Sequence, residues 1–167
     1  MTLERKISKS FKMDEETWLR HANPWSGWTR FSGLPLLAFS FWSRMWFGWA
    51  CVVPIIISLI WIYINPRVFP KPKSTKNWMS RGVFGERVWL NRDKIPVPGH
   101  HKSAPNILSA IGALGLPFVV WGIFRFEIWP LLMGISLVYL GKLWFMDRMV
   151  WLYEDMKHLP EYGKYEY

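Results

Sequence analysis

Apolar residues along this chain gather in two long blocks, at residues 33–64 and 107–145, and most charged residues lie outside them. Each block is longer than the roughly 20 helical residues that cross the hydrocarbon core of a bilayer. A soluble domain would instead alternate apolar and polar residues at the period of a helix or a strand. The pattern therefore predicts an all-α integral membrane protein in which residues 1–167 form a single membrane domain.

The first block is too long for one straight span, and Ser43-Arg44 interrupts it. We therefore predict a first hairpin over residues 28–64, with one helix at 28–42 and a second at 46–64. Two alternatives also fit this block. One is a single long tilted helix, and the other is a re-entrant half-helix followed by one span.

The second block has the same outline as the first. A turn with two charged residues at 125–127 divides it into spans at 106–124 and 128–145, which predicts a second hairpin over residues 106–146. Residues 147–167 form a polar tail, and the last helix is expected to continue into it beyond the membrane. The two hairpins together give about four transmembrane helices.

The polar segment between the hairpins, residues 65–105, carries nine Lys or Arg residues against two acidic ones. Within it, residues 77–92 are predicted to form an amphipathic helix that lies in the headgroup layer. Gly82 and Gly85 weaken this prediction, because glycine disfavours helix. The apolar face of this helix would comprise Met79, Val83 and Leu90.

The distribution of positive charge predicts the topology. With two hairpins, the N-terminal segment (1–27), the middle segment and the tail share one side of the membrane. When Arg30, near the start of the first helix, is counted with that side, 18 of the 21 Lys and Arg residues belong to it, and the exceptions are Arg44, Arg125 and Lys142. Because positively charged loops remain in the cytoplasm, we expect both termini and the middle segment to be cytoplasmic.

Composition supports a membrane protein and excludes several other classes. The 13 Trp residues suit an aromatic belt at the level of the lipid headgroups. The net charge of +9 reports topology rather than nucleic-acid binding. The single cysteine, Cys51, excludes an intrachain disulfide and a cysteine-based metal cluster. No apolar segment follows the basic residues at the N-terminus, so no secretory signal peptide is expected there.

Three long strings in the sequence are unusual enough to suggest a family. They are HANPWSGWTR at residues 21–30, NPRVFPKPKSTKNWMSRGVFGERVWLNR at 65–92 and IPVPGHH at 95–101. Through them the chain, over about residues 14–158, resembles a family of small bacterial and archaeal membrane proteins of unknown function. The resemblance implies a multi-span membrane protein. It implies no activity, substrate or catalytic residue.

Polar residues that would gather on the cytoplasmic face are the candidates for a site. The structural interpretation is a polar latch that pins the middle segment against the helix ends. In it Arg67 would pair with Asp147, and Glu86 with a neighbouring arginine. The latch, or a site in its place, comprises His21, Asn23, Asn65, Arg67, Glu86, Arg87, Asn91 and Asp147.

Two ligand hypotheses concern the same face. His100 and His101, with His21 and a carboxylate from Glu86 or Asp147, have the donor atoms that bind zinc, copper or iron. Their spacing matches no established metal motif, so no cofactor is identified. The basic middle segment is also expected to contact anionic lipid headgroups. The side chains for those contacts are Lys71, Lys73, Lys76, Arg81 and Arg92.

Two functions from different classes fit this sequence. The first is an accessory or structural subunit of a larger membrane complex, for example a membrane oxidoreductase or monooxygenase assembly. Small residues in the last two spans would offer flat faces to other membrane subunits, namely Ala110, Gly112, Ala113, Gly115, Gly134 and Gly141. The alternative is a stand-alone, metal-assisted membrane enzyme that acts on a lipid or amphiphile at the cytoplasmic interface.

Overall fold

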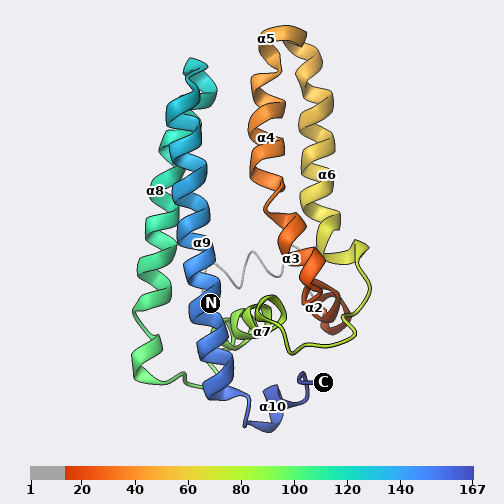
Figure 1. Ribbon diagram of the computed structural model, residues 1–167, viewed down its shortest axis with the longest axis vertical. Helices are drawn as coiled ribbons and strands as arrows, with labels where there is room; N and C mark the ends of the chain where they lie inside the picture. The colour runs from red at the N-terminus through yellow and green to blue at the C-terminus, as the bar shows by residue number, and fades with distance from the viewer. Residues whose placement is uncertain (1–13) are drawn as a thin grey trace.

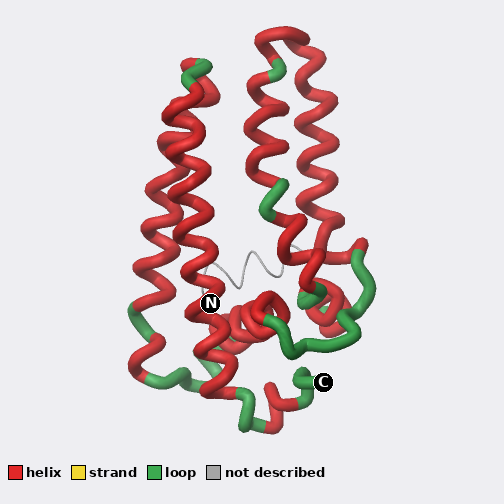
Figure 2. Tube along the Cα trace, in the orientation of Figure 1, coloured by secondary structure: helices red, strands yellow, loops and turns green. Residues whose placement is uncertain are grey.

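The computed structural model describes residues 14–167, which form helices joined by loops and turns, with no strand in that range. Figure 1 shows two pairs of long helices standing side by side, α4 with α6 and α8 with α9, above a base of shorter helices. Figure 2 shows that most loops of the described chain lie in this base. The predicted all-α fold is confirmed.

The first pair consists of two antiparallel legs, because the chain reverses direction after residue 42. Ser40 Oγ and Ser58 Oγ lie 2.9 Å apart, and Trp61 Nε1 donates a hydrogen bond to Ser32 Oγ at 3.0 Å. Residues 28–64 therefore fold back on themselves and do not form one continuous tilted helix. The elements are α2 (Glu15–His21), α3 (Pro24–Arg30), α4 (Gly33–Trp42), α5 (Arg44–Phe47), the 3-10 helix η1 (Gly48–Cys51) and α6 (Val52–Val68).

Three stretches of the described chain are long and apolar enough to cross a membrane, namely Pro24–Val68, Gly99–Arg125 and Ile128–Met156. The first of them contains the hairpin. Its leg α4 has 10 residues, which is roughly 15 Å of helix against roughly 30 Å of hydrocarbon. A count of four crossings therefore stays a prediction.

The second pair consists of α8 (Ala104–Arg125) and α9 (Ile128–Met156), which pack closely along their length. A Cβ added to Gly115 would lie 2.5 Å from Gly134 O, and one added to Gly134 would lie 2.6 Å from Val119 N. The glycine faces are thus used between α8 and α9 within this chain. The sequence had suggested that these glycines, together with Ala110 and Ala113, face other subunits, but of this set only the two alanines are exposed.

The predicted amphipathic helix exists as α7 (Trp78–Leu90), and its apolar residues Met79 and Val83 are buried within the protein. It packs against the lower half of α9, with Gly85 beside the backbone of Met149. The two glycines that weaken the helix prediction are thus the points where α7 approaches α9 most closely. An amphipathic pattern reports that a helix covers an apolar surface, and here that surface is protein.

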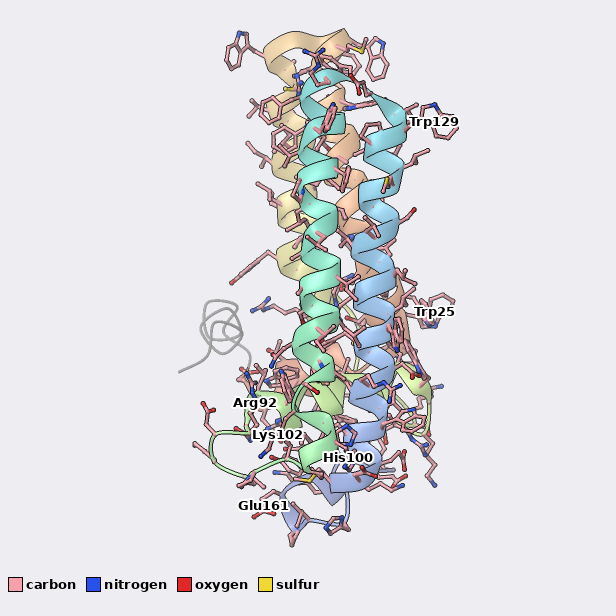
Figure 3. The ribbon with its side chains drawn as sticks, turned by 90° about the vertical axis from the view of Figure 1, so that its left-hand side faces the viewer. Trp25, Arg92, His100, Lys102, Trp129 and Glu161 are labelled. Carbon is pink, nitrogen blue, oxygen red and sulfur yellow. The ribbon has the colours of Figure 1, made fainter. Side chains whose placement is uncertain are left out.

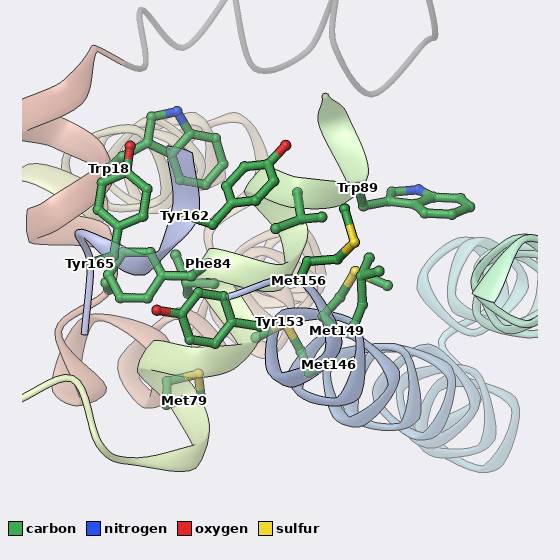
Figure 4. Close-up of a cluster of buried hydrophobic side chains, with 14 of the residues drawn as sticks. Trp18, Met79, Phe84, Trp89, Met146, Met149, Tyr153, Met156, Tyr162 and Tyr165 are labelled. Carbon is green, nitrogen blue, oxygen red and sulfur yellow. The ribbon is translucent and has the colours of Figure 1, made fainter. Parts of the chain in front are cut away.

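A cluster of buried apolar and aromatic side chains holds the base together (Figure 4). We call it the basal cluster. The C-terminal part of the described chain completes it, because Tyr165 stacks on Phe84 with ring centroids 5.1 Å apart. The other elements here are η2 (Gly99–His101) and α10 (Pro160–Gly163). The labelled members in Figure 4 are Trp18, Met79, Phe84, Trp89, Met146, Met149, Tyr153, Met156, Tyr162 and Tyr165.

The two helix pairs also meet at the end opposite the base. Trp42 Nε1 donates to Gly122 O at 3.0 Å, and Arg44 Nη2 donates to Ile123 O at 2.6 Å. These carbonyls belong to the last turns of α8, where a cation is favourable to the helix dipole. The two helix pairs are therefore in contact at both ends. A space bounded by these two regions of contact lies between the pairs.

Candidate functional site

A cavity of about 580 Å³ lies between the two helix pairs, next to the base. This volume falls in the range of small-molecule sites, roughly 300–1,000 Å³. Residues of α6, α8 and α9 form mainly apolar walls, and residues of α2, α3 and α7 close the end towards the base. The lining residues are Trp18, His21, Arg30, Ile62, Pro66, Glu86, Trp89, Leu90, Leu108, Ser109, Gly112, Ala113, Leu116, Val138, Gly141, Lys142 and Phe145.

Four polar side chains meet at the basal end of this cavity. Lys142 Nζ forms an ion pair with Glu86 Oε1, and Arg30 Nη2 lies 2.9 Å from His21 Nδ1. The Nε atom of Arg30 is buried and has no hydrogen-bond partner among the residues that the structure describes. An unpaired buried donor costs free energy, and the positive charge of Arg30 has no carboxylate ion-pair partner among the described residues.

Capping residues set the positions of His21 and Arg30. Asp14 Oδ1 accepts from Thr17 N at 2.7 Å and begins α2, which ends at His21. Asn23 Oδ1 then accepts from Trp25 N at 2.9 Å and begins α3, which ends at Arg30. Two short helices with capped N-termini thus bring both side chains to the same end of the cavity.

The electrostatics of the basal end favour an anion. Burial lowers the pKa of His21 well below its usual value, and the positive charges of Arg30, Lys142 and Arg67 lower it further. The imidazole is therefore neutral near pH 7, and its Nδ1 can accept the hydrogen bond from Arg30. Because Glu86 balances one of the two cations that line the cavity, one net positive charge remains.

Two residues of the predicted latch do join the base of the first pair. Asn65, at the end of α6, is fully buried, and its Nδ2 donates to Thr29 Oγ1 at 2.9 Å. Asn23 Nδ2 donates to Pro70 O at 2.9 Å, which fixes the loop that follows α6. These contacts hold α3 against α6 and the loop that follows it. Of the other predicted latch residues, His21 and Glu86 line the cavity.

The pairings predicted for the other latch residues are wrong. Asp147 accepts a hydrogen bond from Trp78 Nε1 at 3.2 Å instead of pairing with Arg67. The guanidinium of Arg67 lies over the ring of Tyr63, 4.5 Å from its centroid. Glu86 pairs with Lys142 and not with an arginine.

Arg87 and Asn91 stabilise the base away from the cavity. Arg87 forms an ion pair with Glu15 and lies over the ring of Tyr165, 4.6 Å from its centroid. Asn91 caps the C-terminus of α7 and donates its backbone N–H to Val88 O at 3.0 Å. Neither residue lines the cavity.

The basic residues expected to contact lipid divide into two groups. Lys71, Lys73 and Lys76 are exposed on the loop between α6 and α7. Arg81 instead forms an ion pair with Glu154 at 2.8 Å. Arg92 stacks on Trp89, with its guanidinium 4.0 Å from the ring centroid. Contact of the three exposed lysines with lipid therefore stays a prediction, whereas both arginines have partners within the protein.

The two adjacent histidines come together with a carboxylate that the sequence analysis did not name. His100 Nε2 and His101 Nε2 donate to Asp155 Oδ2 at 3.0 and 2.9 Å. The predicted partners, His21 with Glu86 or Asp147, are engaged elsewhere, as described above. None of His100, His101 and Asp155 lines the cavity.

Comparison with models of protein families matches residues 2–161 to a family of unknown function (DUF6653). The chain belongs to this family. Its predicted membership of a family of unknown function is thereby confirmed, and DUF6653 carries no activity over to these residues. Among curated proteins and among solved structures, no match to the chain is found.

Sequence reasoning did not assign Arg30 and Lys142 to the site of this DUF6653 protein. Both are isolated charges at the edges of apolar stretches, and a charge at that position needs a partner or a route to water. The structure gives them partners from distant segments, His21 and Glu86. An isolated charge beside a span is the signal that would have identified them.

Proposed function

We propose that this protein is a membrane protein that binds one amphiphile with an anionic head group in the cavity between its two helix pairs. The observation that carries the proposal is the combination of mainly apolar walls with a cationic end formed by Arg30 and Lys142, of which only Lys142 is paired with a carboxylate. The head group would accept hydrogen bonds from Arg30 and Lys142, and the hydrocarbon chain would lie along α8 and α9.

Binding by charge and binding by apolar contact predict different ligand preferences. Oleate and oleyl alcohol share one hydrocarbon chain and differ in the charge of the head group. A hydrogen bond to a charged group contributes about 1.5–3 kcal/mol, so we expect oleate to bind at least about tenfold more tightly than oleyl alcohol. Titration of the full chain in neutral detergent, followed by native mass spectrometry, measures both affinities.

Two variants separate the contributions to this affinity. Ala113→Phe fills the cavity and should abolish binding of both ligands, whereas Ala110→Phe lies outside the cavity lining on the same helix and should not. Arg30→Gln should bring oleate affinity down to that of oleyl alcohol. Equal affinities for both ligands in the unmodified protein, or unchanged binding by Ala113→Phe, would contradict the proposal.

We further propose that the protein lies in the cytoplasmic membrane of a bacterium or archaeon, with four crossings and with the base in the cytoplasm. The support is the charge distribution, since Arg44 and Arg125 are the Lys or Arg residues at the turns of the two hairpins, whereas the segment 65–105 in the base carries nine. The first hairpin reverses at α5 and η1, the second at residues 125–127, and both turns lie at the end opposite the base (Figure 1).

Labelling of introduced cysteines measures this topology. In a Cys51→Ala background, Met45→Cys in α5 and Glu127→Cys in the second turn should react from outside the cell with a membrane-impermeant maleimide. Lys94→Cys, at the base, should react only after the membrane is opened. Labelling of Glu127→Cys but not Met45→Cys from outside would support a re-entrant first hairpin and contradict four crossings.

The hypothesis of an accessory subunit in a larger complex remains compatible with amphiphile binding. Its original support is weaker, because Gly115, Gly134 and Gly141 pack within the chain. The alternative of a metal-assisted enzyme would need its metal at the amphiphile. The histidine cluster lies outside the cavity lining, so both functions stay predictions and ligand binding is the one we propose.

A further inference from the structure

The cluster of His100, His101 and Asp155 joins two elements that are far apart in the sequence. The histidines form η2, immediately before α8, and Asp155 lies in the last turn of α9. The side chain of His101 is only 3% exposed, while His100 and Asp155 are exposed to 67% and 47%. Figure 3 shows His100 near the base of the molecule. The cluster is therefore anchored by one buried imidazole and is open to solvent on its other side.

We propose that His100, His101 and Asp155 bind one divalent transition-metal ion. Each residue offers one ligand atom, and these atoms all lie within 4.8 Å of one another. Two imidazoles and one carboxylate form a donor set that binds zinc, iron(II) and related ions, with coordination positions left for water. This proposal is independent of amphiphile binding, since none of the three residues lines the cavity.

The geometry requires little rearrangement. Metal–ligand bonds of about 2.0–2.2 Å place neighbouring ligand atoms about 3–3.5 Å apart. The two imidazole nitrogens already lie 3.0 and 2.9 Å from Asp155 Oδ2. Adjustment falls on the two imidazoles, and the exposed ring of His100 can rotate, while His101 stays in its buried position. The ring centroids of the two histidines are already 4.2 Å apart.

A bound ion would act as a clip between the start of α8 and the end of α9. In the ion-free cluster, one carboxylate oxygen accepts hydrogen bonds from both imidazoles. A metal ion replaces those two hydrogen bonds with three coordinate bonds. Because an ion that binds only the folded state stabilises it by mass action, zinc should raise the thermal midpoint of the protein.

Zinc binding to the full chain, purified without a histidine tag and treated with chelator, tests the proposal. Competition with a chromophoric zinc indicator should give one Zn²⁺ per chain and a higher thermal midpoint with zinc. Asp155→Asn keeps the shape of the side chain and removes its charge, and His100→Gln changes an exposed residue. Both should weaken Zn²⁺ binding about 100-fold and abolish the thermal shift, whereas His158→Gln should change neither.

Two results would overturn the proposal of a metal site. If the unmodified protein binds no zinc, the cluster is a hydrogen-bonded contact only, and the proposal is overturned. It is also overturned if His100→Gln and Asp155→Asn bind zinc as well as the unmodified protein does. His101→Gln is the less informative variant, because its buried ring supports the fold. A cooperative thermal transition of each variant without zinc shows whether that variant is folded.

Discussion

Gly85→Ala is expected to destabilise the base more than any other single methyl group added to α7. The new Cβ would overlap the carbonyl oxygen of Met149, which is backbone and cannot rotate away. Overpacking of this kind costs about 3 kcal/mol, and the better helix propensity of Ala returns about 1 kcal/mol. The net loss of about 2 kcal/mol should lower the thermal midpoint by about 4–8 °C.

Gly82→Ala is the matched control on the same helix. There the added Cβ meets the terminal methyl group of Met146 at 2.6 Å, and a flexible side chain of this kind can move aside. We expect a midpoint equal to or slightly above that of the unmodified protein. Thermal unfolding in detergent, followed with a thiol-reactive dye that reports exposure of the buried Cys51, measures both. Equal thermal midpoints for the two variants would contradict the close contact between Gly85 of α7 and the backbone of Met149 in α9.

Gly141→Ala is expected to have the second-largest effect, by separating α8 from α9. The new Cβ would lie 2.6 Å from Gly112 N and 2.9 Å from Leu108 O, both backbone atoms of α8. Helices in a bilayer associate through such close approaches, because apolar burial contributes little there. We expect a loss of about 2 kcal/mol, together with weaker oleate binding, because Gly141 also lines the cavity.

Gly112→Ala tests the same interface from the opposite helix. Its Cβ would lie 3.6 Å from Val138 O and 3.8 Å from Gly141 Cα, which are ordinary van der Waals distances. The midpoint should therefore be unchanged or slightly raised. Equal destabilisation by Gly112→Ala and Gly141→Ala would contradict the packing of α8 on α9, in which only Gly141 lacks room for a Cβ.

The sequence predicted the second hairpin closely, for a physical reason. Charged residues at the turn cannot remain in hydrocarbon, so the break between the spans falls at residues 125–127, between α8 and α9. The first hairpin is less regular. Its leg α4 is short, and α3 precedes it as a separate helix capped by Asn23. Apolar composition alone does not reveal such a break.

The partners of polar residues were predicted poorly, because they depend on packing between distant segments. Glu86 was assigned an arginine, but it pairs with Lys142, which is 56 residues away. The packing of α7 against α9 was not predicted, for a related reason. Hydrophobic periodicity shows which face of a helix is covered, and it does not distinguish lipid from another helix of the same chain.

The stacking of Tyr165 on Phe84 has a consequence for biosynthesis. The two rings are brought together across both legs of the second hairpin, so α7 emerges from the ribosome long before its covering residues. Until α9 and the residues that follow it have been synthesised, Phe84 and its apolar neighbours remain uncovered. A nascent chain arrested in the second hairpin would therefore expose this apolar surface. Exposed apolar surface of this kind is what chaperones and quality-control proteases bind.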